Sequence, residues 1–78
     1  MQYIATFHTH FAAQCFARLI KKENIPGRMM PVPRSLSVSC GTCVSFDTDG
    51  DISSLSVDDI EAVYRVEGNK YELCFKAE

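Results

Sequence analysis

The feature that most constrains this chain is one amphipathic helical pattern that stops at a Pro-Gly pair. Between residues 10 and 22, apolar side chains recur three and four positions apart, the spacing of one face of an α-helix. Thr9 is placed to cap the first turn, and Asn24 can take the left-handed conformation that ends a helix. Pro26 and Gly27 follow at once and do not continue a helix. The sequence therefore predicts a short helix that is set between extended segments.

Extended segments are indicated on both sides of this helix. The first is rich in β-branched and aromatic residues, and the last two alternate between apolar and polar side chains, as strands with one buried face do. Pro31 confines the second segment to an edge strand or to a strand end. The predicted strands cover residues 2–7, 28–32, 42–46 and 70–76.

A second helix is predicted between residues 56 and 67. Ser56 can act as its N-cap with Asp59 three positions later, and Gly68-Asn69 can end it. The resulting order, β-α-β-β-α-β, is that of an α+β ferredoxin-like sandwich, with both helices on one face of an antiparallel sheet. We expect residues 1–78 to form this single domain. The other sheet face would be open, which favours a homodimer or a docked partner protein.

The composition argues against several classes of protein. Eight basic and ten acidic residues give a net charge of −2, without the basic patch that binding to nucleic acid requires. The sequence contains no run of about 20 apolar residues, so we predict no membrane span. The N-terminus lacks the pattern of a signal peptide, so we expect a cytoplasmic protein whose four cysteines are reduced.

The sequence Cys40-Gly41-Thr42-Cys43 is the main candidate for chemistry. A metal site needs more than two ligands. Among the other His and Cys residues, only His8 and His10 form a second pair at metal-ligand spacing, and we expect them to be solvated residues at the start of the predicted helix. We therefore expect no metal or other cofactor. The other His and Cys residues are His8, His10, Cys15 and Cys74.

Three interpretations of this cysteine pair remain open. In an extended chain the two Cα atoms would lie about 10 Å apart, and a disulfide needs them within about 7 Å, so bridging requires a turn at Gly41. Alternatively, Cys40 is the nucleophilic thiol and Cys43 has a secondary, supporting role. Backbone N–H groups of the loop, with Arg34 and Arg28, would then stabilise the Cys40 thiolate. The third interpretation is a loop with two inert thiols.

A longer motif surrounds the cysteine pair. It comprises Ile25-Pro26-Gly27-Arg28, then Pro31-Val32-Pro33-Arg34, then Ser39-Cys40-Gly41. This block resembles the selenium/sulfur carrier protein-like family, which is a family of small bacterial domains, and the resemblance extends over nearly the whole chain. It implies that Cys40 accepts sulfur or selenium from a cysteine desulfurase or another selenium-handling protein and passes it on. Arg34 and Gly41 would support Cys40, whereas the resemblance assigns no role to Cys43.

Three functional hypotheses follow from these observations. The first is a carrier, rather than a complete enzyme, that holds a persulfide or selenopersulfide on Cys40. The second is a non-catalytic interaction module that docks a partner, or a second copy, through its open sheet face. The third is a thiol–disulfide switch between Cys40 and Cys43.

Overall fold

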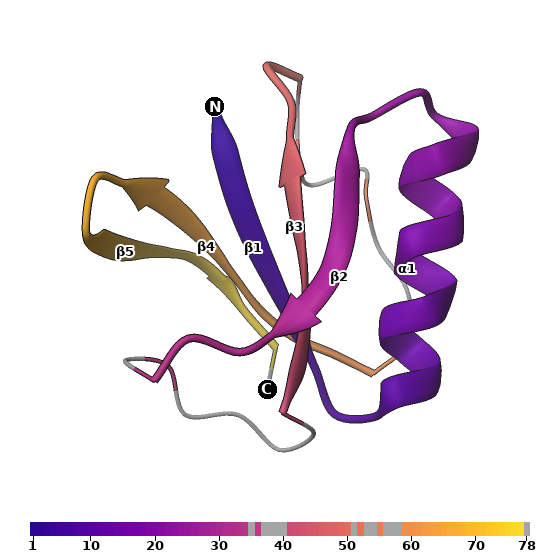
Figure 1. The fold of residues 1–78 in the computed structure, drawn as a ribbon, viewed down its shortest axis with the longest axis horizontal. Helices are drawn as coiled ribbons and strands as arrows, with labels where there is room; N and C mark the ends of the chain where they lie inside the picture. The colour runs from indigo at the N-terminus through magenta and orange to yellow at the C-terminus, as the bar shows by residue number, and fades with distance from the viewer. Residues whose placement is uncertain (35, 37–40, 51, 53–54, 56–58, 78) are drawn as a thin grey trace.

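One helix and five strands make up the regular structure of the described residues. The structure, a computed structural model, describes residues 1–34, 36, 41–50, 52, 55 and 59–77. Its strands form one antiparallel sheet in the order β2-β3-β1-β4-β5. In Figure 1, α1 lies at the β2 side of the sheet and the β4–β5 hairpin lies at the opposite side. The elements are β1 (Gln2–Phe7), α1 (His10–Lys22), β2 (Gly27–Pro31), β3 (Thr42–Asp47), β4 (Ile60–Glu67) and β5 (Lys70–Lys76).

Helix α1 begins and ends as its sequence predicts. The Ala12 N–H donates a hydrogen bond to Thr9 Oγ1 at 3.1 Å, which satisfies one of the unpaired donors of the first turn. At the other end, Asn24 has a φ of 59° and Ile25 N–H donates to Ile20 O at 2.8 Å. This left-handed cap turns the chain into β2.

The main core lies between α1 and the sheet. Phe16 of α1 is fully buried, and its ring centroid lies 5.3 Å from those of Phe7 and Phe46. Such ring separations are typical of aromatic packing in protein interiors. The same cluster includes Tyr3, Ala5, Ala12, Ala13, Ile20, Val44, Leu55, Ile60 and Val63.

Gly27 allows α1 and β2 to approach closely. A Cβ atom at this position would lie 2.6 Å from Ile20 Cδ1 and 2.6 Å from the Ser45 carbonyl oxygen. Both distances are below van der Waals contact, so the space accepts no side chain. The Pro26-Gly27 pair therefore stops the helix and also packs the following strand beneath it.

The predicted second helix is wrong. Residues 60–67 form β4, which pairs with β1 on one side and β5 on the other. Gly68, with a φ of 58°, and Asn69 make the two-residue turn of the β4–β5 hairpin rather than a helix end. The fold is therefore α+β with one helix on a five-stranded antiparallel sheet, and not a ferredoxin-like sandwich with two helices. Ser56 and the other residues of its predicted first turn lie outside the described residues.

The sheet face away from α1 is not bare at its centre, contrary to the prediction of an open face. Side chains alternate along each strand, so the neighbours of the core residues point to this second face. Ile4 and Thr6 of β1, Cys43 of β3 and Ala62 of β4 are all buried there. Exposed apolar side chains lie instead at the edge of the sheet, where Leu73 and Phe75 of β5 are 51% and 47% exposed.

Candidate functional site

The candidate site lies where β2 ends and β3 begins. Pro31 pairs with Thr42, and one step further Val32 N–H donates to Gly41 O at 3.1 Å. The segment between Val32 and Gly41 therefore leaves the sheet and returns to it at one end of the hairpin, the lower end in Figure 1. Cys40, the predicted reactive cysteine, lies outside the described residues and is bonded to Gly41.

Gly41 has a backbone conformation that suits glycine. Its φ is 72°, in the left-handed region that other residues seldom adopt. No heavy atom lies within 4 Å of the position that its Cβ would take, so space does not select glycine here. Its positive φ at the start of β3 does select glycine. The predicted support of Cys40 by Gly41 stays a prediction.

Cys43 lies in the interior, on the sheet face away from α1. Its side chain is fully buried, and its Sγ donates a weak hydrogen bond to the Pro31 carbonyl oxygen at 3.8 Å. A buried cysteine packs as a small apolar residue, and its thiol is not exposed to reagents or partner proteins. The packing of Cys43 therefore resembles that of a small core residue, while its predicted supporting role stays a prediction.

The two arginines predicted to support Cys40 lie at different places. Arg34 is exposed in a turn closed by Leu36 N–H, which donates to Pro33 O at 3.0 Å, so it belongs to the segment that leads to Cys40. Arg28 lies near the start of β2 opposite Ser45, three residues before the Pro31–Thr42 pair. At about 3.3 Å per residue, Arg28 lies about 10 Å from Pro31 along the strand.

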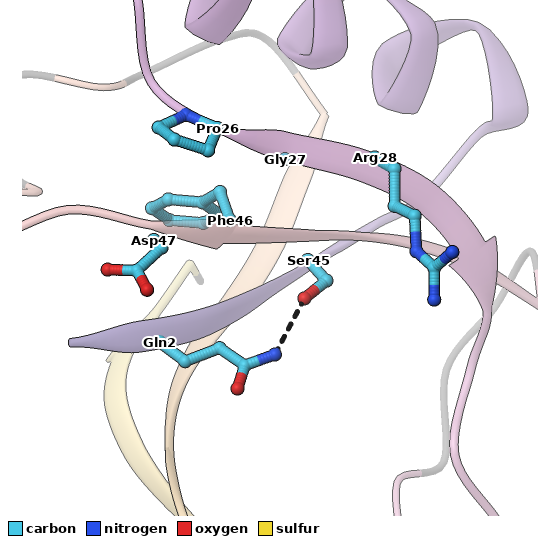
Figure 2. A pocket seen from close by; sticks show the side chains of 7 residues that line it. All are labelled: Gln2, Pro26, Gly27, Arg28, Ser45, Phe46 and Asp47. Carbon is cyan, nitrogen blue, oxygen red and sulfur yellow. Dashed lines mark hydrogen bonds between the residues drawn. The ribbon is translucent and has the colours of Figure 1, made fainter.

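Arg28 borders a shallow hollow of mixed polar and apolar lining at the other end of the β2–β3 hairpin. Its predicted support of Cys40 stays a prediction. Figure 2 shows its guanidinium group on the same side of the sheet as Ser45 and Gln2. Gln2 Nε2 donates to Ser45 Oγ at 3.1 Å. Asp47, also in the lining, accepts from the N-terminal ammonium of Met1 at 3.2 Å, and Asp49 accepts from the same group at 3.1 Å.

The structure adds His10 to the candidate site. Its Nδ1 lies 3.4 Å from Thr42 Oγ1, which brings the first turn of α1 beside the first residue of β3. No spacing in the sequence indicates this contact, because 32 residues separate the two positions and only the packing of α1 on the sheet joins them. Both His8 and His10 are exposed, as expected for residues at a helix start.

The remaining cysteines differ in exposure. Cys15 of α1 is half-buried and Cys74 of β5 is exposed. Among the described residues, no three His, Cys, Asp or Glu side chains are grouped so that they could hold a metal ion. Within the same part of the chain, no helix has the length and apolar character needed to cross a membrane.

Comparison with protein-family models gives a match that covers most of the chain. The model of the family described as "Putative Se/S carrier protein-like" matches residues 2–57. This match runs from β1 through α1, β2 and β3 and includes the Cys40-Gly41 pair, whereas β4 and β5 lie beyond it. Comparisons with curated protein sequences and with solved structures give no match. Because the matched residues make up more than half of the chain, the chain belongs to the Se/S carrier protein-like family.

Proposed function

We propose that this protein carries sulfur or selenium on Cys40, as a persulfide or selenopersulfide, between a donor enzyme and an acceptor. The observation that carries this proposal is the family match over residues 2–57, which includes Cys40 and the proline-rich block before it. A carrier also suits a chain of 78 residues, which has room for one small core and little room for an enclosed substrate pocket.

The transfer step exchanges one sulfur–sulfur bond for another. The Cys40 thiolate attacks the outer sulfur of a persulfide on the donor, a bond forms between the two sulfur atoms, and the donor's own sulfur leaves as a thiolate. Cys40 then holds the transferred sulfur as a persulfide anion. Delivery repeats the same exchange with a thiolate of the acceptor, so no external oxidant or reductant takes part.

Two residues close to Cys40 in the sequence are suited to this chemistry. Arg34 is an exposed cation within the segment that leads to Cys40, and a nearby cation lowers the pKa of a thiol. Gly41, with its positive φ, permits a turn in which successive N–H groups face an anion. Both effects would favour the thiolate and the persulfide anion over their protonated forms.

The packing of Cys43 favours a division of roles between the two cysteines. A fully buried thiol is out of reach of a donor protein, whereas a carrier thiol has to meet two partners in turn. We therefore assign transfer to Cys40 and treat Cys43 as part of the packed face. A cytoplasmic location and a cysteine desulfurase as donor belong to the same proposal.

The experiment incubates the protein with a cysteine desulfurase and cysteine, then measures the intact mass without reductant. We expect the wild type to gain the mass of one sulfur atom, and Cys40→Ala to gain none. Cys43→Ala serves as the matched control and should retain the adduct if it folds, which its unfolding curve checks. A wild type without an adduct would refute the desulfurase as the donor, and an adduct that persists in Cys40→Ala would refute Cys40 as the carrier thiol.

A further inference from the structure

The net charge of this chain is small, but its basic and acidic residues are concentrated in different parts of the sequence. Residues 1–46 contain five basic residues and one acidic residue, a net charge of +4. Residues 47–78 contain three basic and nine acidic residues, a net charge of −6. A separation of this size creates opposite potentials on different parts of a small protein, and these steer charged partners toward one side.

Helix α1 holds most of the positive charge of the first half. Arg18, Lys21 and Lys22 are exposed, and α1 itself contains no acidic residue. Among the ion pairs that the described residues form, none includes these three side chains. Cations three and four positions apart on a helix repel one another. The helix dipole offsets this cost for Lys21 and Lys22 in the last turn, but it does so less for Arg18.

The same face of α1 begins with an exposed aromatic ring. Phe11 is 70% exposed, more than any other large apolar side chain described. Positions 11, 14, 18 and 22 follow the helical period and so lie on one side of α1, away from the buried residues Ala12, Ala13, Phe16 and Ile20. Aromatic side chains and arginine are enriched at protein interfaces relative to the rest of the surface.

This outer face of α1 starts beside the candidate site. His10, next to Phe11, lies 3.4 Å from Thr42 Oγ1, and Thr42 is two residues from Cys40. From there the face extends along thirteen helical residues, about 20 Å. A strip of this length can form the centre of one side of a protein–protein interface, which in a complex of standard size buries about 800 Å² per partner.

We propose that the outer face of α1, from Phe11 to Lys22, is the docking surface for the protein that donates sulfur to Cys40. This inference depends on the proposed function. The partner's surface would be acidic, to pair with Arg18, Lys21 and Lys22, and would contain an apolar pocket for Phe11. Docking on this face would bring the partner's persulfide to the end of the β2–β3 hairpin, where Gly41 and Thr42 lie.

The test compares loading of Cys40 by a protein donor with loading by a small molecule. Initial rates of sulfur transfer are measured from a purified cysteine desulfurase with cysteine and, separately, from inorganic polysulfide, which needs no docking. The variants are Lys21→Glu/Lys22→Glu and Phe11→Ser. The matched control is Lys70→Glu/Lys76→Glu, which changes the net charge equally on the exposed strand β5. Thermal unfolding confirms that every variant folds.

We expect the α1 double variant to lose about tenfold in the rate of transfer from the desulfurase, because charge pairs at an interface act mainly on the association rate. Phe11→Ser should lose a similar factor, whereas Lys70→Glu/Lys76→Glu should stay near wild type. Rising salt should slow the wild type and affect the α1 variant little. Rates with polysulfide should be the same for all four proteins.

Several results would overturn the docking inference. Equal losses in the α1 and β5 double variants would show an effect of net charge alone, and equal losses with polysulfide would indicate damage at Cys40 itself. The inference also fails if wild type takes sulfur from polysulfide but not from the desulfurase, a result that leaves Cys40 as a sulfur carrier. A salt-sensitive dimer that Lys21→Glu/Lys22→Glu abolishes would assign this face to a second copy. If Cys40 takes sulfur from neither source, the proposed function itself is refuted.

Discussion

Two parts of the molecule are built differently. The first part consists of β1, α1, β2 and β3, and the second part is the β4–β5 hairpin. Helix α1 packs on β1, β2 and β3, and the fully buried aromatic residues Phe7, Phe16 and Phe46 all lie in the first part. Strand β4 adds buried residues to the sheet, but six of the seven residues of β5 are exposed. The family match ends at residue 57, so it covers the first part and stops before the hairpin.

This difference separates two roles within one sheet. The first part holds the candidate site, because the Val32–Gly41 contact and the His10–Thr42 contact both lie within it. Strand β4 pairs with the other side of β1, and β5 protects the edge of β4. We therefore expect changes in the first part to affect both stability and transfer, and changes in β5 to affect each less.

The largest contrast is expected between two phenylalanines. Phe16→Ala removes a fully buried ring from the centre of the core, which costs about 3–5 kcal/mol in unfolding free energy. Phe75→Ala removes a ring that is 47% exposed on β5 and should cost about 1 kcal/mol, because less apolar area returns to water. Urea denaturation of both variants measures the difference. Equal losses would contradict the division between the two parts.

A smaller contrast is expected between two glycines. Gly27→Ala places a Cβ atom against Ile20 and the Ser45 backbone, so we expect a loss of about 1–3 kcal/mol in unfolding free energy. Gly50→Ala meets only Thr48 Oγ1, at 3.5 Å, and should change stability by less than about 0.5 kcal/mol. Denaturation midpoints separate the two. If Gly27→Ala were as stable as Gly50→Ala, α1 and β2 would not pack as closely as described.

The cap of α1 should have a smaller effect again. Thr9→Ala removes the oxygen that accepts the Ala12 N–H and should cost about 1 kcal/mol in unfolding free energy. Thr9→Ser keeps the acceptor and is the control. Since α1 begins beside Thr42, Thr9→Ala should also change the amide chemical shift of Thr42, whereas substitutions in β5 should leave it unchanged. An unaltered Thr42 signal would argue against that contact.

The smallest effect concerns pH. With Met1 as first residue, hydrogen bonds from its ammonium to Asp49 and Asp47 raise the pKa of this group above its usual value of 8.0. A group whose pKa is raised on folding stabilises the protein below its unfolded pKa, and this contribution disappears as the pH rises through the folded pKa. The melting temperature should therefore fall slightly above pH 8, and Asp47→Asn/Asp49→Asn should flatten the fall. An equally steep fall in that variant would assign it to other groups.

Short-range signals in the sequence predict the first part well. The Thr9 cap, the left-handed Asn24 and the end of β2 at Pro31 each depend on residues within one turn or one strand, and the structure confirms them. The alternation of residues 42–46 likewise predicts β3, with Cys43 facing away from Val44 and Phe46.

The second part was mispredicted because its local signals are ambiguous. Ser56 and Asp59 resemble a capping box, and Gly68-Asn69 suits either a helix end or a two-residue hairpin turn. Pairing of residues 60–67 with β1 decides between them, and that pairing joins positions more than fifty residues apart. The His10–Thr42 contact and the separation of Arg28 from Gly41 depend in the same way on packing and strand register.

The most direct test compares Cys40, the assigned carrier thiol, with Cys74, an exposed cysteine that has no assigned role in transfer. Cys40 lies in the matched part of the chain, whereas Cys74 is exposed on β5, beyond the family match. Protein loaded by a cysteine desulfurase is alkylated, digested and fragmented in a mass spectrometer to locate the added sulfur. We predict that the adduct lies on Cys40 and is absent from Cys74 and Cys43. An adduct on Cys74 at an equal or higher level would mean that exposure alone selects the thiol, which would contradict the assignment of Cys40 as the carrier.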